Sequence, residues 1–188
     1  GSELRPVVVS PHDDFAPRYL PNGNNIFVST RRGGYSRCGP DFAPCHTLTL
    51  ADANGASQRL ISFHEVHEYD PAVMNDGRVV YTRWDYNDRG QLYPQPLFQM
   101  NSDGTAQAEY YGNSSWFPTT VAHARSIPDS DKVIAIATGH HCIQTGALLL
   151  LDVNHGRQEA TGATLVAPAP LRSRTCATPS IVNRWGEL

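Results

Sequence analysis

One combination of short signals occurs three times in the sequence and limits the fold more than any other feature. An aromatic residue stands two positions before a proline at Phe15, Tyr69 and Trp116, so that the prolines recur at intervals of 54 and 47 residues. In the first two units a glycine follows six residues after the proline, and a β-rich run comes next. Glycine beside Asn or Asp supplies the backbone conformations of tight hairpin turns. We therefore expect Phe15, Tyr69 and Trp116 to occupy equivalent places in three repeated units.

A second signal follows the first in the same order. Each unit later contains a short apolar run that ends in a glycine turn, and the glycines Gly55, Gly104 and Gly156 are 49 and 52 residues apart. A period near 50 residues with several short strands is typical of propeller blades. A β-sandwich also has frequent turns, but it does not repeat two signals in a fixed order. The sequence predicts an all-β fold, a partial β-propeller of about three to four antiparallel blades.

The repeat suggests one propeller segment over residues 1–188. Its units run roughly over 10–60, 64–110 and 113–160, and 175–188 resembles the start of a further unit. A closed propeller usually has four to eight blades. We therefore expect the partner of this chain to be the remainder of the propeller or another copy of the chain. The alternative is a compact domain with an irregular last segment.

Composition excludes two classes of partner. The formal net charge is −3 and basic residues form no block, so binding to nucleic acid is not expected. No apolar run approaches the roughly 20 residues that a membrane-spanning helix needs, so membrane insertion is not expected either.

The cysteines point to an exported protein, in the periplasm or secreted. Cys38, Cys45, Cys142 and Cys176 form an even set, which fits two disulfides in an oxidising compartment. Four cysteines allow three connectivities, and we expect Cys38–Cys45, which bracket a short Pro-rich loop, and Cys142–Cys176. Four reduced thiols in a cytosolic protein are the alternative.

Two histidine groups are candidate ligands of a divalent metal. The segment "FHEVHEYD" contains His64 and His67, and "TGHHC" contains His140 and His141 beside Cys142. Imidazole and carboxylate groups bind zinc and similar ions. Residues three apart on a strand point to opposite faces, so His64 and His67 would share an ion only from a loop. The alternative, favoured for both groups, is hydrogen bonding, within the loop for His67 and Glu68 and to neighbouring blades for the pair His140 and His141.

The segment "TRWDYNDRG" places Arg83, Asp85, Asp88 and Arg89 around two aromatic residues. Two nearby carboxylates are compatible with acid–base catalysis. Intermingled Arg and Asp fit better with ion pairs that hold blades together. The sequence has no nucleophile elbow, phosphate-binding loop or HExxH motif, so no catalytic residue is identified and the chain alone is not expected to be an enzyme.

The run "LPNGNNIFVSTRRGG" with "LTLADANGASQRL" resembles the TolB-like, PD40-type propeller repeat. From His67 to about Arg157, segments such as "HEYDPAVMNDGRVVYTRWDY" and "ARSIPDSDKVIAIATGHH" are similar to the middle-domain family of the hydrazine synthase alpha subunit. That resemblance implies a propeller domain found in exported bacterial proteins. Hydrazine synthase carries covalent haem, but this sequence lacks Cys-x-x-Cys-His, the attachment signature, so its chemistry is not carried over.

These observations predict a binding or scaffold module of an exported bacterial protein, which presents loops to a protein, a glycan or a small ligand. The alternative is a non-catalytic part of a metal- or haem-dependent redox enzyme related to the hydrazine synthase alpha subunit. No cofactor is assigned beyond a possible divalent metal. Fold alone does not decide between these functions, because activity resides in sites.

Overall fold

The structure is a computed structural model that describes residues 3–37, 42–86, 94–139 and 146–167. The predicted segment 175–188 lies outside these ranges. The described residues form three sheets of four strands each and a short 3-10 turn, η1 (Val153–His155). The strands are β1 (Asp14–Tyr19), β2 (Asn25–Ser29), β3 (Thr47–Ala51), β4 (Arg59–Leu60), β5 (His67–Val73), β6 (Val79–Trp84), β7 (Leu97–Met100), β8 (Ala108–Tyr111), β9 (Thr120–Ser126), β10 (Val133–Thr138), β11 (Ala147–Leu151) and β12 (Ala163–Ala167).

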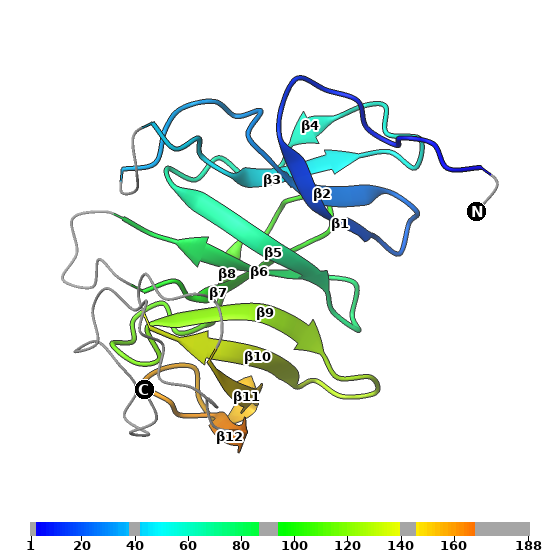
Figure 1. Cartoon of the computed structure of the whole chain (residues 1–188). Coiled ribbons are helices and arrows are strands. Elements are labelled where there is room, and N and C mark those ends of the chain that lie inside the picture. The colour runs from blue at the N-terminus through cyan, green and yellow to red at the C-terminus, as the bar shows by residue number, and fades with distance from the viewer. Residues whose placement is uncertain (1–2, 38–41, 87–93, 140–145, 168–188) are drawn as a thin grey trace.

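Each sheet is an antiparallel meander in which consecutive strands pair in chain order. The first strand of the second sheet, β5, lies between β1 and β9, so the sheets follow one another like blades (Figure 1). This arrangement confirms the predicted all-β blade architecture. Connections in a meander alternate between the two ends of a sheet. One edge of the structure, which we call the loop edge, therefore contains strand ends from all three sheets. These are the C-terminal ends of β2, β6 and β10 and the N-terminal ends of β3, β5, β7, β9 and β11.

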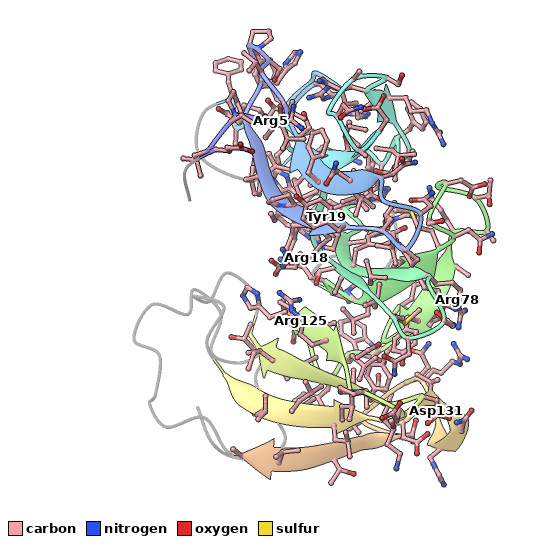
Figure 2. All side chains as sticks on the ribbon, turned by 90° about the vertical axis from the view of Figure 1, so that its right-hand side faces the viewer. Arg5, Arg18, Tyr19, Arg78, Arg125 and Asp131 are labelled. Atoms are coloured by element: carbon pink, nitrogen blue, oxygen red, sulfur yellow. The ribbon has the colours of Figure 1, made fainter. Side chains whose placement is uncertain are left out.

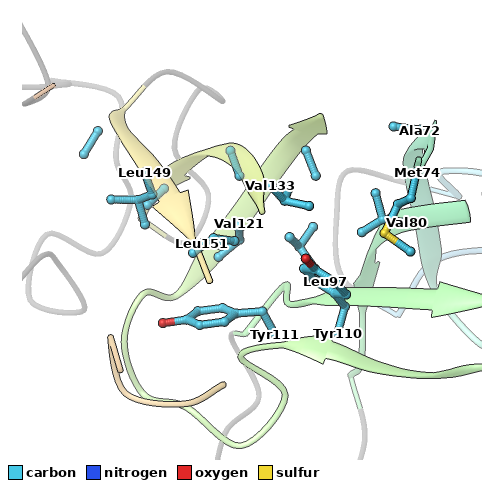
Figure 3. Close-up of a cluster of buried hydrophobic side chains, with 14 residues drawn as sticks. Ala72, Met74, Val80, Leu97, Tyr110, Tyr111, Val121, Val133, Leu149 and Leu151 are labelled. Carbon is cyan, nitrogen blue, oxygen red and sulfur yellow. The ribbon is translucent and has the colours of Figure 1, made fainter. Parts of the chain in front are cut away.

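The core lies between the sheets because successive residues of a strand point to opposite faces. In β6, Val79 and Tyr81 pack toward the first sheet, whereas Val80 packs toward the third. The cluster between the second and third sheets contains Leu97, Tyr111, Val121, Val133, Leu149 and Leu151 (Figure 3). The cluster between the first and second sheets contains Leu20, Ile26, Val28, Leu48, Leu50, Ile61, Phe98 and Met100 together with Val79 and Tyr81 of β6.

A bulge interrupts the pairing of the first strand in every sheet. At each bulge one residue other than glycine has a positive φ: Ala16 at 50°, Asp70 at 52° and His123 at 56°. These residues are 54 and 53 positions apart, which makes the bulge a more regular marker of the repeat than the prolines.

The bulges correct one prediction about the repeat. Pro17 and Pro71 lie inside the first strands, directly after the bulge residue, where a proline removes no ladder hydrogen bond. Aligning the sheets on the bulges makes Phe15 and Tyr69 equivalent to Ala122 and not to Trp116. Trp116 precedes β9 and is 53% exposed. Its proline therefore belongs to the linker between blades, and the predicted equivalence is wrong.

Two of the repeated turn glycines allow close packing between segments. Gly104 follows β7 with a φ of 92°, and a Cβ there would lie 2.7 Å from the Ile61 Cβ and 2.8 Å from the Ile61 carbonyl oxygen. At Gly55, which has a φ of 79°, the backbone of Val7 occupies the same place. Ile61 and Val7 stand in matching positions, each nine residues before a bulge residue, Asp70 or Ala16. The chain entering each of these sheets thus packs on that sheet's own glycine turn.

Candidate functional site

The structure brings together polar residues from two segments that the sequence singles out. The β5–β6 register pairs Glu68 with Arg83, and the linker between β4 and β5 carries further polar side chains to the same place. We call this group the junction cluster, because it lies where the first sheet passes into the second. Its members are Ser62, His64, Glu68, Tyr81, Arg83 and Asp85.

His64, Asp85 and Arg83 form a continuous set of contacts. His64 Nε2 lies 2.7 Å from Asp85 Oδ1 and 2.9 Å from the backbone oxygen of Trp84. Both partners are acceptors, so Nε2 carries a proton. Arg83 Nε donates to Asp85 at 2.9 Å, and its guanidinium group stands 4.6 Å above the centre of the Phe98 ring. Burial by itself would raise the pKa of Asp85, but His64 and Arg83 together hold it below its ordinary value.

Glu68 is the most unusual member of the cluster. Its side chain is fully buried, and neither carboxylate oxygen has a hydrogen-bond partner within the described part of the chain. Burial raises the pKa of Glu68, while the nearby Ser62 hydroxyl and the charges of His64 and Arg83 act in the opposite direction. The Tyr81 hydroxyl is also buried without a described partner. Buried polar groups of this kind are rare outside functional sites and sites that hold water or a ligand.

A row of aromatic rings runs along the loop edge from the first sheet to the second. His46 lies 5.1 Å from Phe15 and 4.9 Å from His67, measured between ring centres. His67 in turn stacks on Trp84 at 5.9 Å. Burial, and next the charge of His46, lowers the pKa of His67 to about 4. The His67 ring is therefore neutral at pH 7, and its Nδ1 accepts the backbone N–H of His46 at 3.3 Å.

These contacts place the predicted metal ligands in separate environments. His64 is bonded to Asp85, whereas His67 belongs to the ring row. Among the described residues, no three His, Cys, Asp or Glu side chains converge as a group able to hold a metal ion. His140, His141 and Cys142 lie outside the described residues, as do Asp88 and Arg89, so the second metal site stays a prediction.

Cys45 does not support the predicted Cys38–Cys45 bridge. It is a buried free thiol whose Sγ lies 3.3 Å from the backbone oxygen of Glu65, so the side chain turns inward toward the β4–β5 linker. Burial raises the pKa of this thiol. Cys38, Cys142 and Cys176 lie outside the described residues, and the Cys142–Cys176 bridge stays a prediction.

We expect Cys45 to react with iodoacetamide slowly in the folded protein and fully after unfolding without a reductant. The thiolate is the reactive form, and a buried protonated thiol supplies little of it. Peptide mass measurement after alkylation, with and without denaturant, gives both rates. An unalkylated Cys45 in unfolded, unreduced protein would instead demonstrate a disulfide.

An open pocket lies beside the junction cluster, with a volume of about 410 Å³. The Phe63 ring, which is 69% exposed, stands at this pocket. Gln107, directly before β8, lines the pocket as well, and its Nε2 donates to the Ile61 oxygen at 3.0 Å. The remaining lining residues are His64, Glu65 and Arg83. The pocket thus combines one exposed ring with polar side chains, of which His64, Arg83 and Gln107 are held by other contacts.

The sequence did not single out Phe63, Gln107, Ser62 or Tyr81. Phe63 could have been found from the sequence, because it is an aromatic residue inside a polar linker directly before His64. Tyr81 is hidden in the run "RVVYTRW", which is typical of an ordinary strand. Gln107 follows a turn and becomes relevant only through the packing of that turn on Ile61.

No protein family and no curated sequence matches this chain. Among solved structures it is similar to TolB from Acinetobacter baumannii, with a TM-score of 0.53 and 12% identity over 83% of this chain and 33% of that one. It is also similar to an oligogalacturonate lyase in complex with manganese, with a TM-score of 0.53 and 14% identity over 83% of this chain and 36% of the lyase. A third similar structure is a puromycin-hydrolyzing peptidase of Mycobacterium tuberculosis, with a TM-score of 0.54 and 12% identity over 86% of this chain and 22% of the peptidase.

At these identities the likeness shows the fold alone, which is a TolB-like propeller fold. The chain spans between 22% and 36% of the length of the three structures. Within the described residues, no helix has the length and apolar character needed to cross a bilayer.

Proposed function

We propose that the chain is a ligand-binding scaffold module of an exported bacterial protein, and that the pocket beside the junction cluster receives the ligand. The exposed Phe63 ring carries this proposal, because exposed apolar surface next to fixed polar groups is typical of interaction sites. Export is supported by the resemblance to domains of exported bacterial proteins.

The chemistry of the pocket favours a glycan as the ligand. The face of an aromatic ring offers a flat apolar surface for a sugar ring. Glu65, Arg83 and Gln107 surround it with acceptors and donors suited to hydroxyl groups. Asp85 and the Phe98 ring already hold Arg83, so little ordering is required when a ligand binds.

Titration calorimetry with a panel of soluble oligosaccharides tests the proposal. Phe63→Ala is expected to weaken binding at least about tenfold, in line with the loss of an aromatic anchor. Trp116→Ala is the matched control, because Trp116 is an exposed ring in the linker before the third sheet and should leave affinity within about twofold. An oligosaccharide that binds both variants equally, or a panel without any binder, contradicts the assignment.

The alternative function is that of a non-catalytic part of a metal- or haem-dependent redox enzyme related to the hydrazine synthase alpha subunit. Its support is the sequence resemblance over residues 67–157. An absorption spectrum and metal analysis of the purified chain separate the two functions. A Soret band or a stoichiometric divalent metal favours the redox alternative, whereas a colourless, metal-free protein that binds oligosaccharides favours the scaffold module.

We further propose that the partner of the chain is the remainder of a propeller or another copy of the chain. Phe15 and Tyr19 leave apolar surface uncovered beside β1, and the Tyr19 side chain is 75% exposed. Burying a few hundred Å² of such surface contributes several kcal/mol at roughly 25 cal/mol per Å². The isolated chain should therefore self-associate at micromolar concentration in sedimentation velocity. A compact monomer with a sharp cooperative melt contradicts this expectation.

A further inference from the structure

The first strands β1, β5 and β9 line the concave side of the three sheets, and their bulges place matching residues there (Figure 2). The position two residues after the bulge is Arg18 in the first sheet, Ala72 in the second and Arg125 in the third. Arg18 and Arg125 face each other across this concave side, one from each outer blade. The residue at this position in β5, Ala72, is buried in the core between the second and third sheets and adds no third charge.

The two arginines lack acidic partners within the described residues. Arg18 Nη1 donates to the backbone oxygen of its neighbour Pro17 at 2.7 Å, and Arg125 Nη1 donates to that of Ala124 at 2.6 Å. Neither takes part in an ion pair with any other residue that the structure describes, whereas Arg31, Arg78 and Arg83 each pair with an aspartate. Each guanidinium group therefore keeps most of its five N–H donors available.

The two charges are close enough to affect each other. Partial burial, and next the positive charge of Arg18, lowers the pKa of Arg125, while Asp70 acts in the opposite direction. Asp70 itself lies 3.1 Å from His123 Nδ1, and these two are the bulge residues of adjacent sheets. Asp70, the acidic group that acts on Arg125, is thus shared with a histidine, and one carboxylate offsets at most one of the two arginine charges.

We propose that Arg18 and Arg125 form an oxyanion-binding site on the concave side of the blades, which holds a carboxylate or phosphate group of a ligand between the two guanidinium groups. Planar guanidinium groups bind both kinds of oxyanion through paired N–H donors. An anion there would also remove the repulsion between two like charges. The site is separate from the pocket at Phe63, and this inference does not depend on the glycan proposal.

Calorimetric titration of the chain with inorganic phosphate and, separately, with acetate tests the site, with sodium chloride at equal ionic strength as the reference. At least one of the two anions should bind more tightly than chloride and raise the melting temperature. Arg18→Gln and Arg125→Gln should each weaken that binding at least about tenfold, which corresponds to the loss of a charge-assisted contact. Arg59→Gln is the matched control, because Arg59 is an exposed arginine of β4 that donates to the Asp103 backbone.

Binding of phosphate alone assigns the site to phosphoryl groups, and binding of acetate alone assigns it to carboxylates. Circular dichroism shows whether each variant is folded. Arg125 is exposed and Arg18 is half-buried, and both donate only to the backbone of a neighbouring residue, so folding should be retained. The proposal is overturned if chloride has the same effect as both oxyanions, or if Arg59→Gln weakens binding as much as the other two substitutions.

Discussion

Replacing Glu68 by Gln is expected to raise the free energy of unfolding by about 1–3 kcal/mol near pH 8. Glu68 is fully buried, and neither of its oxygens has a described hydrogen-bond partner. A carboxylate in this place loses its hydration without gaining equivalent contacts, which is why its pKa is raised. A glutamine of nearly the same shape avoids the charged state altogether.

The sign of the pH dependence follows from the direction of the shift. Below the ordinary pKa of 4.5, the Glu68 carboxyl is protonated in the folded and the unfolded chain, and Glu68→Gln should have little effect. As the pH rises above 4.5, the unfolded chain releases its proton first, so the wild-type chain loses stability until the pH passes the raised folded-state pKa. The advantage of the Gln variant should grow over this window and stay constant above it.

Urea unfolding of both proteins between pH 4 and pH 9 measures this difference. Glu3→Gln is the matched control, since it removes the same charge from an exposed residue near the N-terminus and should change stability by less than about 0.5 kcal/mol. Equal stability of wild type and Glu68→Gln across the whole range would mean that the ionised Glu68 is fully compensated by its surroundings.

The repeat could be predicted because its turns depend on residue type. Gly23, Gly77, Gly55 and Gly104 all have positive φ values, and glycine is the residue that adopts such values without strain. The bulge is a better marker of the blades, but its residues Ala16, Asp70 and His123 share no side-chain chemistry. Their conformation follows from strand pairing, so the sequence pattern does not contain it. The predicted equivalence of Trp116 with Phe15 and Tyr69 was wrong for this reason, because the aromatic-x-Pro pattern was used to locate the repeat and the bulge in the backbone was not visible in the sequence.

The candidate site was predictable in part. Glu68 and Arg83 belong to segments that the sequence marked as polar, and the hairpin between β5 and β6 brings them opposite each other. Their chemistry was harder to predict, because the pairing of His64 with Asp85 requires the linker to fold back on β6. Metal binding by His64 and His67 was one interpretation of the sequence and hydrogen bonding the favoured one, and in the structure each ring is held by different neighbours.

Gly104→Ala is expected to lower the free energy of unfolding by about 2–4 kcal/mol. Two effects act together at this position. The φ of 92° is unfavourable for any residue with a Cβ, and the added methyl group would meet the Cβ and the backbone oxygen of Ile61 at 2.7 and 2.8 Å. Backbone atoms do not move aside as a flexible side chain does, so the turn after β7 must shift away from the linker.

Gly23→Ala separates these two effects. Gly23 has a similar φ of 83°, but a Cβ there has no atom within 4 Å. It should therefore show the backbone strain alone, at about 1 kcal/mol. Urea unfolding of the two variants measures the contribution of packing as the difference between them, and equal losses would mean that Ile61 adapts without cost.

The displaced turn should also affect the pocket. Gln107 Nε2 donates to the oxygens of Ile61 and Gly104 at 3.0 and 3.2 Å, so a shift of this turn away from the linker moves Gln107 relative to Phe63. At a temperature where both variants are folded, Gly104→Ala should weaken oligosaccharide binding, whereas Gly23→Ala should leave it unchanged. Unchanged binding by a destabilised Gly104→Ala protein would show that Gln107 does not help to form the ligand site.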